Sequence, residues 1–137
     1  MKEHNSIIKI TLEHYPNTQA IYLFGSYGTD QKGSGSDVDI AVLLPPVVSR
    51  NLDSLILSNT QVALEALLKR DVDLINLRKA PTVLQKEVIQ SDRRIYAGDE
   101  YAAEEFEMLT LSFYQKLNEE RAEIISDALS GGRFYQL

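Results

Sequence analysis

The chain has 137 residues, the length of one domain around one hydrophobic core, and its 44% apolar and 25% charged residues are ordinary for a globular protein. Its 14 basic and 20 acidic residues give a net charge of -6, which argues against general nucleic-acid binding because such binding needs a basic surface. The chain contains no cysteine, which excludes disulfides and thiolate metal sites, and it has no apolar run as long as a membrane span. We therefore expect a single domain over residues 1–137, with no direct contact to nucleic acid or membrane.

Apolar periodicity and turn residues predict helices and strands that alternate along the chain. In chain order they are a helix at 3–14, strands at 19–24 and about 37–44, a helix at 52–67, a strand at 71–77, a helix through 83–88 and a short edge strand at 94–96. The second strand stops at Pro45 and Pro46, because proline cannot continue a central ladder. This order predicts an α+β (α/β mixed) fold, with a small mixed sheet flanked by helices.

A long helix at about 99–129, capped by Asp99, is predicted to end the domain. We expect an apolar stripe at its start to pack on the sheet; it consists of Phe106, Leu109, Phe113 and Leu117. The apolar positions continue to Ile124, Ile125 and the tail residues Phe134 and Tyr135, which is more than a domain of this size easily covers. The excess is a candidate surface for a partner, with packing inside the domain as the alternative.

A loop rich in glycine and serine separates the first two predicted strands. Gly25 and Ser26 open this loop, and Ser36 stands at its end. Such a turn can bring backbone N–H groups close to phosphate oxygens, and Ser36 is a candidate to add a hydroxyl near a metal or phosphate. We therefore predict a phosphate-binding loop.

Carboxylates follow the loop at once. Asp37 and Asp39 are two residues apart at the start of the second strand, so their side chains point the same way. The third strand offers Asp71 and Asp73, again on one face. We favour Asp73, because it lies one step deeper in an apolar strand, where an unpaired carboxylate is costly unless a cation neutralises it. Asp71 follows two basic residues and has a simpler alternative, which is pairing with them.

Three carboxylates beside a phosphate loop have the composition of a magnesium–triphosphate site. Two Mg²⁺ ions, roughly 3.5–4 Å apart, stabilise the attacking and leaving oxygens of an in-line displacement. On this interpretation Asp37 and Asp39 bridge both ions, while Asp73 holds the catalytic ion and accepts or orients the proton of an incoming hydroxyl. Gly25 and Ser26 would bind the β- and γ-phosphates, and pyrophosphate would leave from the α-phosphorus.

At these residues the chain resembles the nucleotidyltransferases of the polymerase-beta superfamily, and within them the minimal nucleotidyltransferases. The resemblance rests on Gly25 and Ser26, the pair Asp37 and Asp39, and a third acidic residue, Asp73, on a later strand. It departs in the loop, where many relatives carry arginine and this chain has Tyr27 and Thr29. Arg50 or the basic pair at 69–70 could then help to bind phosphate from a distance.

Many minimal nucleotidyltransferases are antitoxins paired with HEPN-domain ribonuclease toxins. The resemblance therefore implies a cytoplasmic enzyme that uses ATP and Mg²⁺ to transfer AMP to a tyrosine of such a toxin, its protein partner, and so blocks RNA cleavage. Two alternatives remain open: an antitoxin that neutralises its toxin by binding alone, and a nucleotidyltransferase that acts on a small molecule.

Overall fold

The computed structural model describes residues 2–25, 37–52 and 58–131, with side chains described as far as residue 125. Its four strands are β1 (Ala20–Phe24), β2 (Val38–Leu43), β3 (Val72–Asn76) and β4 (Arg94–Ala97). They form one sheet in the order β3-β2-β1-β4, in which β2 and β3 are parallel and the other two pairs are antiparallel. The predicted mixed sheet is confirmed.

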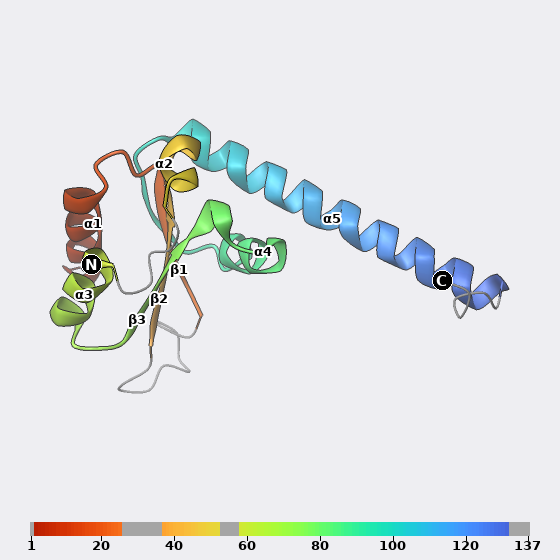
Figure 1. Cartoon of the computed structure of the whole chain (residues 1–137), viewed down its shortest axis with the longest axis horizontal. Helices are drawn as coiled ribbons and strands as arrows, with labels where there is room; N and C mark the ends of the chain where they lie inside the picture. The colour runs from red at the N-terminus through yellow and green to blue at the C-terminus, as the bar shows by residue number, and fades with distance from the viewer. Residues whose placement is uncertain (1, 26–36, 53–57, 132–137) are drawn as a thin grey trace.

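Helices cover both faces of this sheet (Figure 1). One face packs on α1 (Lys2–His14) and α3 (Asn59–Leu68), and the other packs on α4 (Thr82–Gln90) and the start of α5 (Glu100–Gly131). Alternate residues of β1 and β2 therefore enter two separate hydrophobic clusters, and every residue of β1 is buried. Burial on both sides explains why these strands read as continuous apolar runs rather than as alternating patterns.

The helix expected over 52–67 is confirmed from Asn59 onward, whereas Leu52 and Ser58 are not helical. A short helix, α2 (Pro46–Arg50), begins directly after β2, with Pro46 in its first turn, where proline is tolerated. The next described helix is α3, and its N-cap Ser58 accepts a hydrogen bond from the backbone N–H of Gln61 at 3.2 Å. Residues 53–57 lie outside the described part of the chain. A 3₁₀ turn, η1 (Leu77–Lys79), follows β3.

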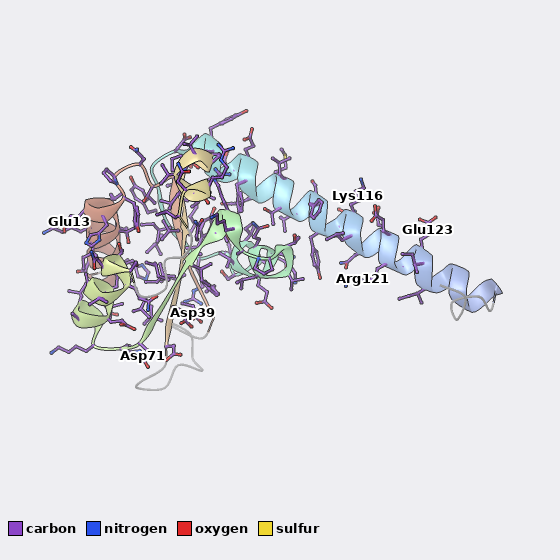
Figure 2. The ribbon with its side chains drawn as sticks, viewed as in Figure 1. Glu13, Asp39, Asp71, Lys116, Arg121 and Glu123 are labelled. Carbon is purple, nitrogen blue, oxygen red and sulfur yellow. The ribbon has the colours of Figure 1, made fainter. Side chains whose placement is uncertain are left out.

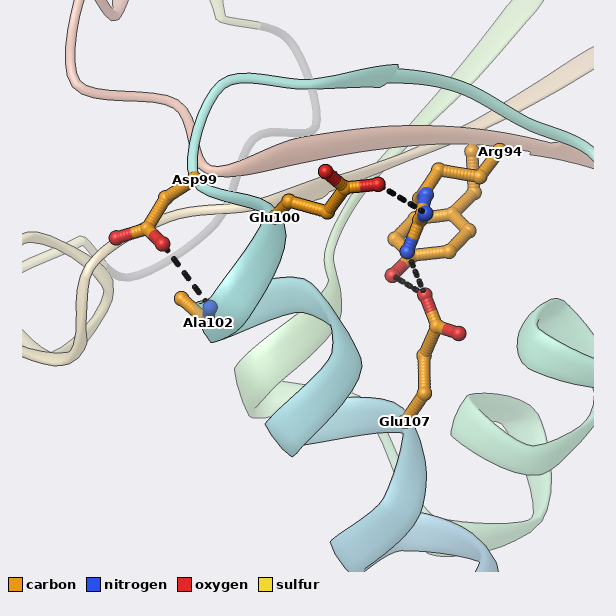
Figure 3. A network of polar contacts seen from close by, with 6 residues as sticks. Arg94, Asp99, Glu100, Ala102 and Glu107 are labelled. Atoms are coloured by element: carbon orange, nitrogen blue, oxygen red, sulfur yellow. Dashed lines mark hydrogen bonds and ion pairs between the residues drawn. The ribbon is translucent and has the colours of Figure 1, made fainter.

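Polar contacts attach the start of α5 to the sheet (Figure 3). Asp99 accepts a hydrogen bond from the backbone N–H of Ala102 at 3.0 Å, which confirms the predicted cap. One carboxylate oxygen of Glu107 accepts from the Tyr22 hydroxyl and from Arg94 Nη1, both at 2.7 Å. Arg94 is also 3.9 Å from Glu100. These bonds link α5 to β1 and β4.

The expected packing of the apolar stripe of α5 is only partly correct. Phe106 packs on the sheet, but Leu109 is 57% exposed and Phe113 is 53% exposed. The face that packs carries the buried residues Ala103 and Thr110, and a helix turns by about 100° per residue. Leu109 is therefore turned away from the contact. Phe113, seven residues after Phe106, lies on the same side of the helix and is exposed because α5 extends away from the domain (Figure 1).

Beyond this contact α5 extends away from the domain, as Lys116, Arg121 and Glu123 show in Figure 2. The described side chains from residue 118 to 125 are all exposed. A search of the described residues finds no helix of sufficient length and hydropathy to span a membrane.

Candidate active site

The predicted acidic residues meet at one end of the sheet. Asp39 on β2 and Asp73 on β3 are register partners in the parallel pair, and Asp37 stands one residue before β2. The backbone N–H of Val38 donates to the carbonyl of Asp71 at 2.9 Å, which fixes the two strands at this end. Asp39 and Asp71 mark the site at the lower end of the sheet in Figure 2.

Asp39 is the most perturbed of these carboxylates. Burial, a hydrogen bond with Asp73 and the negative charges of Asp73 and Asp37 raise its pKa from 3.8 to about 6, while the positive charge of Arg93 acts in the opposite direction. The largest cause is burial, because the low dielectric disfavours the charged form. Several carboxylates held close together with too little positive charge are typical of a functional site.

Asp73 lies beside Asp39, as predicted. Burial, the reason for preferring it to Asp71, was wrong. The side chain of Asp73 is exposed, as is that of Asp37, whereas Asp39 is half-buried. The burial cost that favoured Asp73 therefore does not apply. Strand register places Asp73 beside Asp39, whereas Asp71 lies one residue before β3 begins and precedes its paired segment.

Gly25 directly follows β1 and lies beside Asp39. It has a φ of +74°, in the left-handed region that favours glycine. A Cβ at this position would overlap Oδ2 of Asp39, closer than nonbonded atoms approach. Only glycine therefore fits between the end of the strand and the carboxylate. Ser26 and Ser36, the other predicted loop residues, lie outside the described residues.

The structure adds a residue that the sequence reasoning missed. Arg93 precedes β4, and its Nη1 donates to the carbonyl oxygen of Gly25 at 2.8 Å. The sequence feature that could have drawn attention to Arg93 is the basic pair Arg93 and Arg94 at the predicted edge strand. No local pattern, however, predicts that this pair contacts the loop. By contrast Arg50, a predicted distant phosphate ligand, lies on α2 at the opposite end of the sheet (Figure 1).

Arg50 lines a cavity of about 350 Å³ at that opposite end, together with Arg78, Lys79 and Phe106. The Arg78 guanidinium lies over the Phe106 ring, 5.4 Å from its centroid. Arg78 also donates to the carbonyl of Leu44 and, through Nη2, to Gln19 Oε1, each at 2.5 Å. Both of these bonds join Arg78 to the rest of the domain and are remote from the acidic site.

The acidic residues have the chemistry that a magnesium ion requires, since carboxylate oxygens are its preferred protein ligands. Within the described ranges, however, no three acidic or histidine side chains already stand in an arrangement that could hold a metal ion. Burial, the largest cause, and the like charges of Asp73 and Asp37 raise the pKa of Asp39, so a cation bound beside Asp39 would favour its charged form. Asp37, Asp39 and Asp73 thus fit a divalent ion by composition and charge, and their roles stay a prediction.

A mixed sheet that presents this acidic end beside a glycine turn defines the class of nucleotidyltransferases. Residues 5–101 match the family described as polymerase beta, nucleotidyltransferase. The chain belongs to this family. It is 38% identical over 126 residues to the protein adenylyltransferase MntA of Shewanella oneidensis, with 92% of this chain and 87% of that protein covered.

Solved structures of such proteins share the fold. A toxin–antitoxin crystal structure with AMP-PNP contains a chain that is 37% identical, with a TM-score of 0.74, over 92% of this chain and 98% of that one. A structure of the tri-AMPylated Shewanella oneidensis HEPN toxin in complex with its MNT antitoxin gives 37% identity and a TM-score of 0.69, over 93% of this chain and 96% of that one. The predicted nucleotidyltransferase fold with a long C-terminal helix is therefore confirmed.

Proposed function

We propose that this chain is an antitoxin that transfers AMP from ATP to a tyrosine hydroxyl of a HEPN-domain ribonuclease toxin. The observation that carries the proposal is the pairing of Asp39 with Asp73 beside the tight turn at Gly25. The similarity to a protein adenylyltransferase, and to an antitoxin in complex with an AMPylated HEPN toxin, supports the choice of substrate and partner.

In this proposal Asp37, Asp39 and Asp73 hold two Mg²⁺ ions, and Gly25, Ser26 and Ser36 bind the triphosphate. When bound, the ions would neutralise charge on the phosphates and stabilise the attacking and leaving oxygens of an in-line displacement. The exposure of Asp37 and Asp73 suits a site that must receive both a nucleotide and a protein side chain.

The reaction exchanges one phosphorus–oxygen bond for another. The tyrosine oxygen forms a bond to the α-phosphorus of ATP, and the bond from that phosphorus to the β-phosphate oxygen breaks. Pyrophosphate leaves with the electron pair, and Asp73 accepts or orients the proton of the tyrosine hydroxyl. Tyrosine has a pKa near 10 in water, so a carboxylate beside it favours loss of the proton during attack.

The distal part of α5 is proposed as the surface that binds the toxin. Ile124 and Ile125 are 57% and 56% exposed, and they follow Glu123 on the part of α5 that extends away from the domain (Figure 2). Acidic residues Glu119, Glu120 and Glu123 share this segment with one arginine, Arg121. A ribonuclease needs a basic surface for RNA, so an acidic helix with apolar anchors is complementary to it.

A double substitution, Ile124→Ser with Ile125→Ser, tests this surface in the full chain. Its affinity for the co-encoded HEPN-domain protein is expected to fall by about tenfold or more, as for apolar anchors in other interfaces. Asn118→Ser, an exposed polar position on the same helix, is the matched control and is expected to bind normally. Wild-type affinity of the double variant would contradict the assignment of α5 to the interface.

The whole chain is proposed to act as one domain in the cytoplasm, where ATP is available. Two other functions are distinguishable from this one. Neutralisation by binding alone would leave protection intact after Asp39→Ala. Transfer to a small molecule would label a compound in the assay and leave the HEPN-domain protein unlabelled.

The decisive experiment combines the purified chain with α-phosphate-labelled ATP, Mg²⁺ and its co-encoded neighbour. Label on a tyrosine of the neighbour, release of pyrophosphate and loss of both in Asp39→Ala or Asp73→Ala are expected. If Asp39→Ala protects cells as well as the wild type, transfer is not what neutralises the toxin.

A further inference from the structure

A turn before β4 is fixed to the end of β1 by its backbone. The N–H of Leu23 donates to the carbonyl of Arg93 at 3.0 Å, and the hydroxyl of Ser91 lies 3.1 Å from the carbonyl of Leu23 and 2.6 Å from that of Val88, at the end of α4. Asp92, between Ser91 and Arg93, has a φ of +55°, a left-handed conformation that reverses the chain there. The backbone of Arg93 is therefore held against β1 independently of its side chain.

The side chain of Arg93 makes a further contact beyond the last strand residue. Its Nη1 donates to the carbonyl oxygen of Gly25 at 2.8 Å, although the two residues are 68 positions apart in the sequence. A hydrogen bond from a guanidinium to a carbonyl is charge-assisted and stronger than a neutral one. This bond holds the first residue of the predicted phosphate loop where strand pairing no longer does.

Gly25 in turn fixes where Asp39 can lie. The space that a Cβ at Gly25 would occupy is filled by Oδ2 of Asp39, so the strand end and the carboxylate are in close contact. If Gly25 moves toward β2, it displaces the carboxylate of Asp39. If Gly25 moves away from β2, space opens beside that carboxylate. The position of Asp39 thus depends on a backbone segment that Arg93 holds.

Arg93 also balances charge at this point. Asp73 and Asp37 act on Asp39 as like charges, and Arg93 is the cation that opposes them. A guanidinium stays protonated at all accessible pH values, so its charge is permanent. Arg93 therefore combines a fixed contact to the loop entrance with a fixed charge beside the carboxylates.

We propose that Arg93 is a positioning residue for nucleotide transfer, which holds the end of β1 at Gly25 and thereby sets the place of Asp39 in the acidic site. The inference rests on the proposed function, since the effect is on that reaction. Arg93 acts through Gly25 and Asp39. A purely structural role, in which the bond only attaches the β4 edge to β1, is the competing explanation.

The test compares Arg93→Ala and Arg93→Lys with the wild type in the complete chain, assayed with labelled ATP, Mg²⁺ and the co-encoded HEPN-domain protein. Arg50→Ala is the matched control, because it removes the same charge at the opposite end of the sheet. Thermal unfolding and hydrogen exchange of residues 20–25 are measured alongside kcat and the KM for ATP.

We expect Arg93→Ala to lower kcat by about tenfold or more, since small misplacements of reacting groups carry costs of this order. The KM for ATP is expected to rise as well, because Gly25, which Arg93 holds, is also proposed to contact the triphosphate. Arg93→Lys should recover part of the rate, and hydrogen exchange should rise at residues 20–25 alone. Arg50→Ala should match the wild type.

The inference is overturned if Arg93→Ala keeps the wild-type kcat. It is also overturned if Arg93→Ala loses activity only in proportion to the loss of folded protein and Arg93→Lys restores none of that activity. A wild-type chain that transfers no label would refute the proposed function instead. In that case hydrogen exchange still tests whether Arg93 holds the end of β1. Unchanged exchange at residues 20–25 in Arg93→Ala would show that the arginine does not hold this segment.

Discussion

Gly25 and Asp39 are in direct contact at the end of β1, so close that any side chain at position 25 would overlap the carboxylate. The register of the antiparallel pair brings them together, because Phe24, the last residue of β1, lies opposite Asp39 on β2. The turn that opens the predicted phosphate loop and the carboxylate that is predicted to hold metal are therefore one structural unit. A change at either residue is expected to affect the other.

Gly25→Ala is expected to abolish nucleotide transfer and to destabilise the fold. The alanine side chain would displace Asp39, and its left-handed φ would add strain of about 1–3 kcal/mol. Binding of a non-hydrolysable ATP analogue and thermal unfolding measure the two effects. Gly98→Ala is the control, because a Cβ there would meet the Thr18 carbonyl at 2.9 Å, far from the acidic end. Normal analogue binding by folded Gly25→Ala would contradict the prediction.

Asp39→Asn is expected to make the metal-free protein more stable at neutral pH. The folded-state pKa of Asp39 is raised from 3.8 to about 6, chiefly by burial, so the folded protein holds this proton more tightly than the unfolded chain does. The free energy of unfolding of the wild type should therefore decrease as the pH rises through about 4 to 6, relative to the variant.

Urea unfolding at several pH values, without divalent ions, measures this difference. Asp92→Asn serves as the control, since asparagine tolerates the left-handed φ of +55° at this position. A constant difference between the wild type and Asp39→Asn over this range would show that Asp39 does not titrate as described.

Asp73→Asn should lower the transfer rate by about a hundredfold or more, whereas Asp71→Asn should leave most of it. Asp73 pairs with Asp39 across the parallel strands, and Asp71 interacts with β2 through its backbone carbonyl, which the substitution keeps. Rates of AMP transfer at saturating ATP measure the effect. The reverse order of the two variants would assign the third carboxylate to Asp71.

Glu107→Ala is expected to reduce the free energy of unfolding by about 1–3 kcal/mol, because it leaves the Tyr22 hydroxyl and one Arg94 donor without their partner (Figure 3). Glu104→Ala, an exposed position one turn earlier, should have little effect. In a double-mutant cycle, Tyr22→Phe should cost less in the Glu107→Ala background than in the wild type. Additive losses would mean that the hydroxyl and the carboxylate do not cooperate.

The turn at Gly25 and the Asp37–Asp39 strand were predictable because their signals are local. Glycine and serine between two apolar runs predict a turn, and residues two apart on a strand share a face whatever surrounds them. The last helix and its Asp99 cap follow from local signals in the same way, and the structure confirms them.

Other features depend on elements that are far apart in the sequence. Burial was the wrong reason to choose Asp73, because the exposure of a side chain depends on the neighbouring strand and helices rather than on the apolar residues beside it. The expected packing of Leu109 and Phe113 was wrong for a similar reason. A helical stripe shows that a face is apolar, but the docking of α5 decides which of its residues are covered: its rotation turns Leu109 away from the sheet, and its extension away from the domain leaves Phe113 exposed.

By itself, the amino-acid sequence determined the four strands and the helices other than α2, together with the spacing of the carboxylates at 37 and 39 and the glycine turn before them, because backbone geometry and side-chain spacing act over a few residues. The tertiary structure alone decided that Asp73 is the register partner of Asp39, that Arg93 reaches Gly25 and that residues 118–125 of α5 are exposed. These relations arise from strand order and helix docking, which depend on the packing of the whole chain and have no local signature.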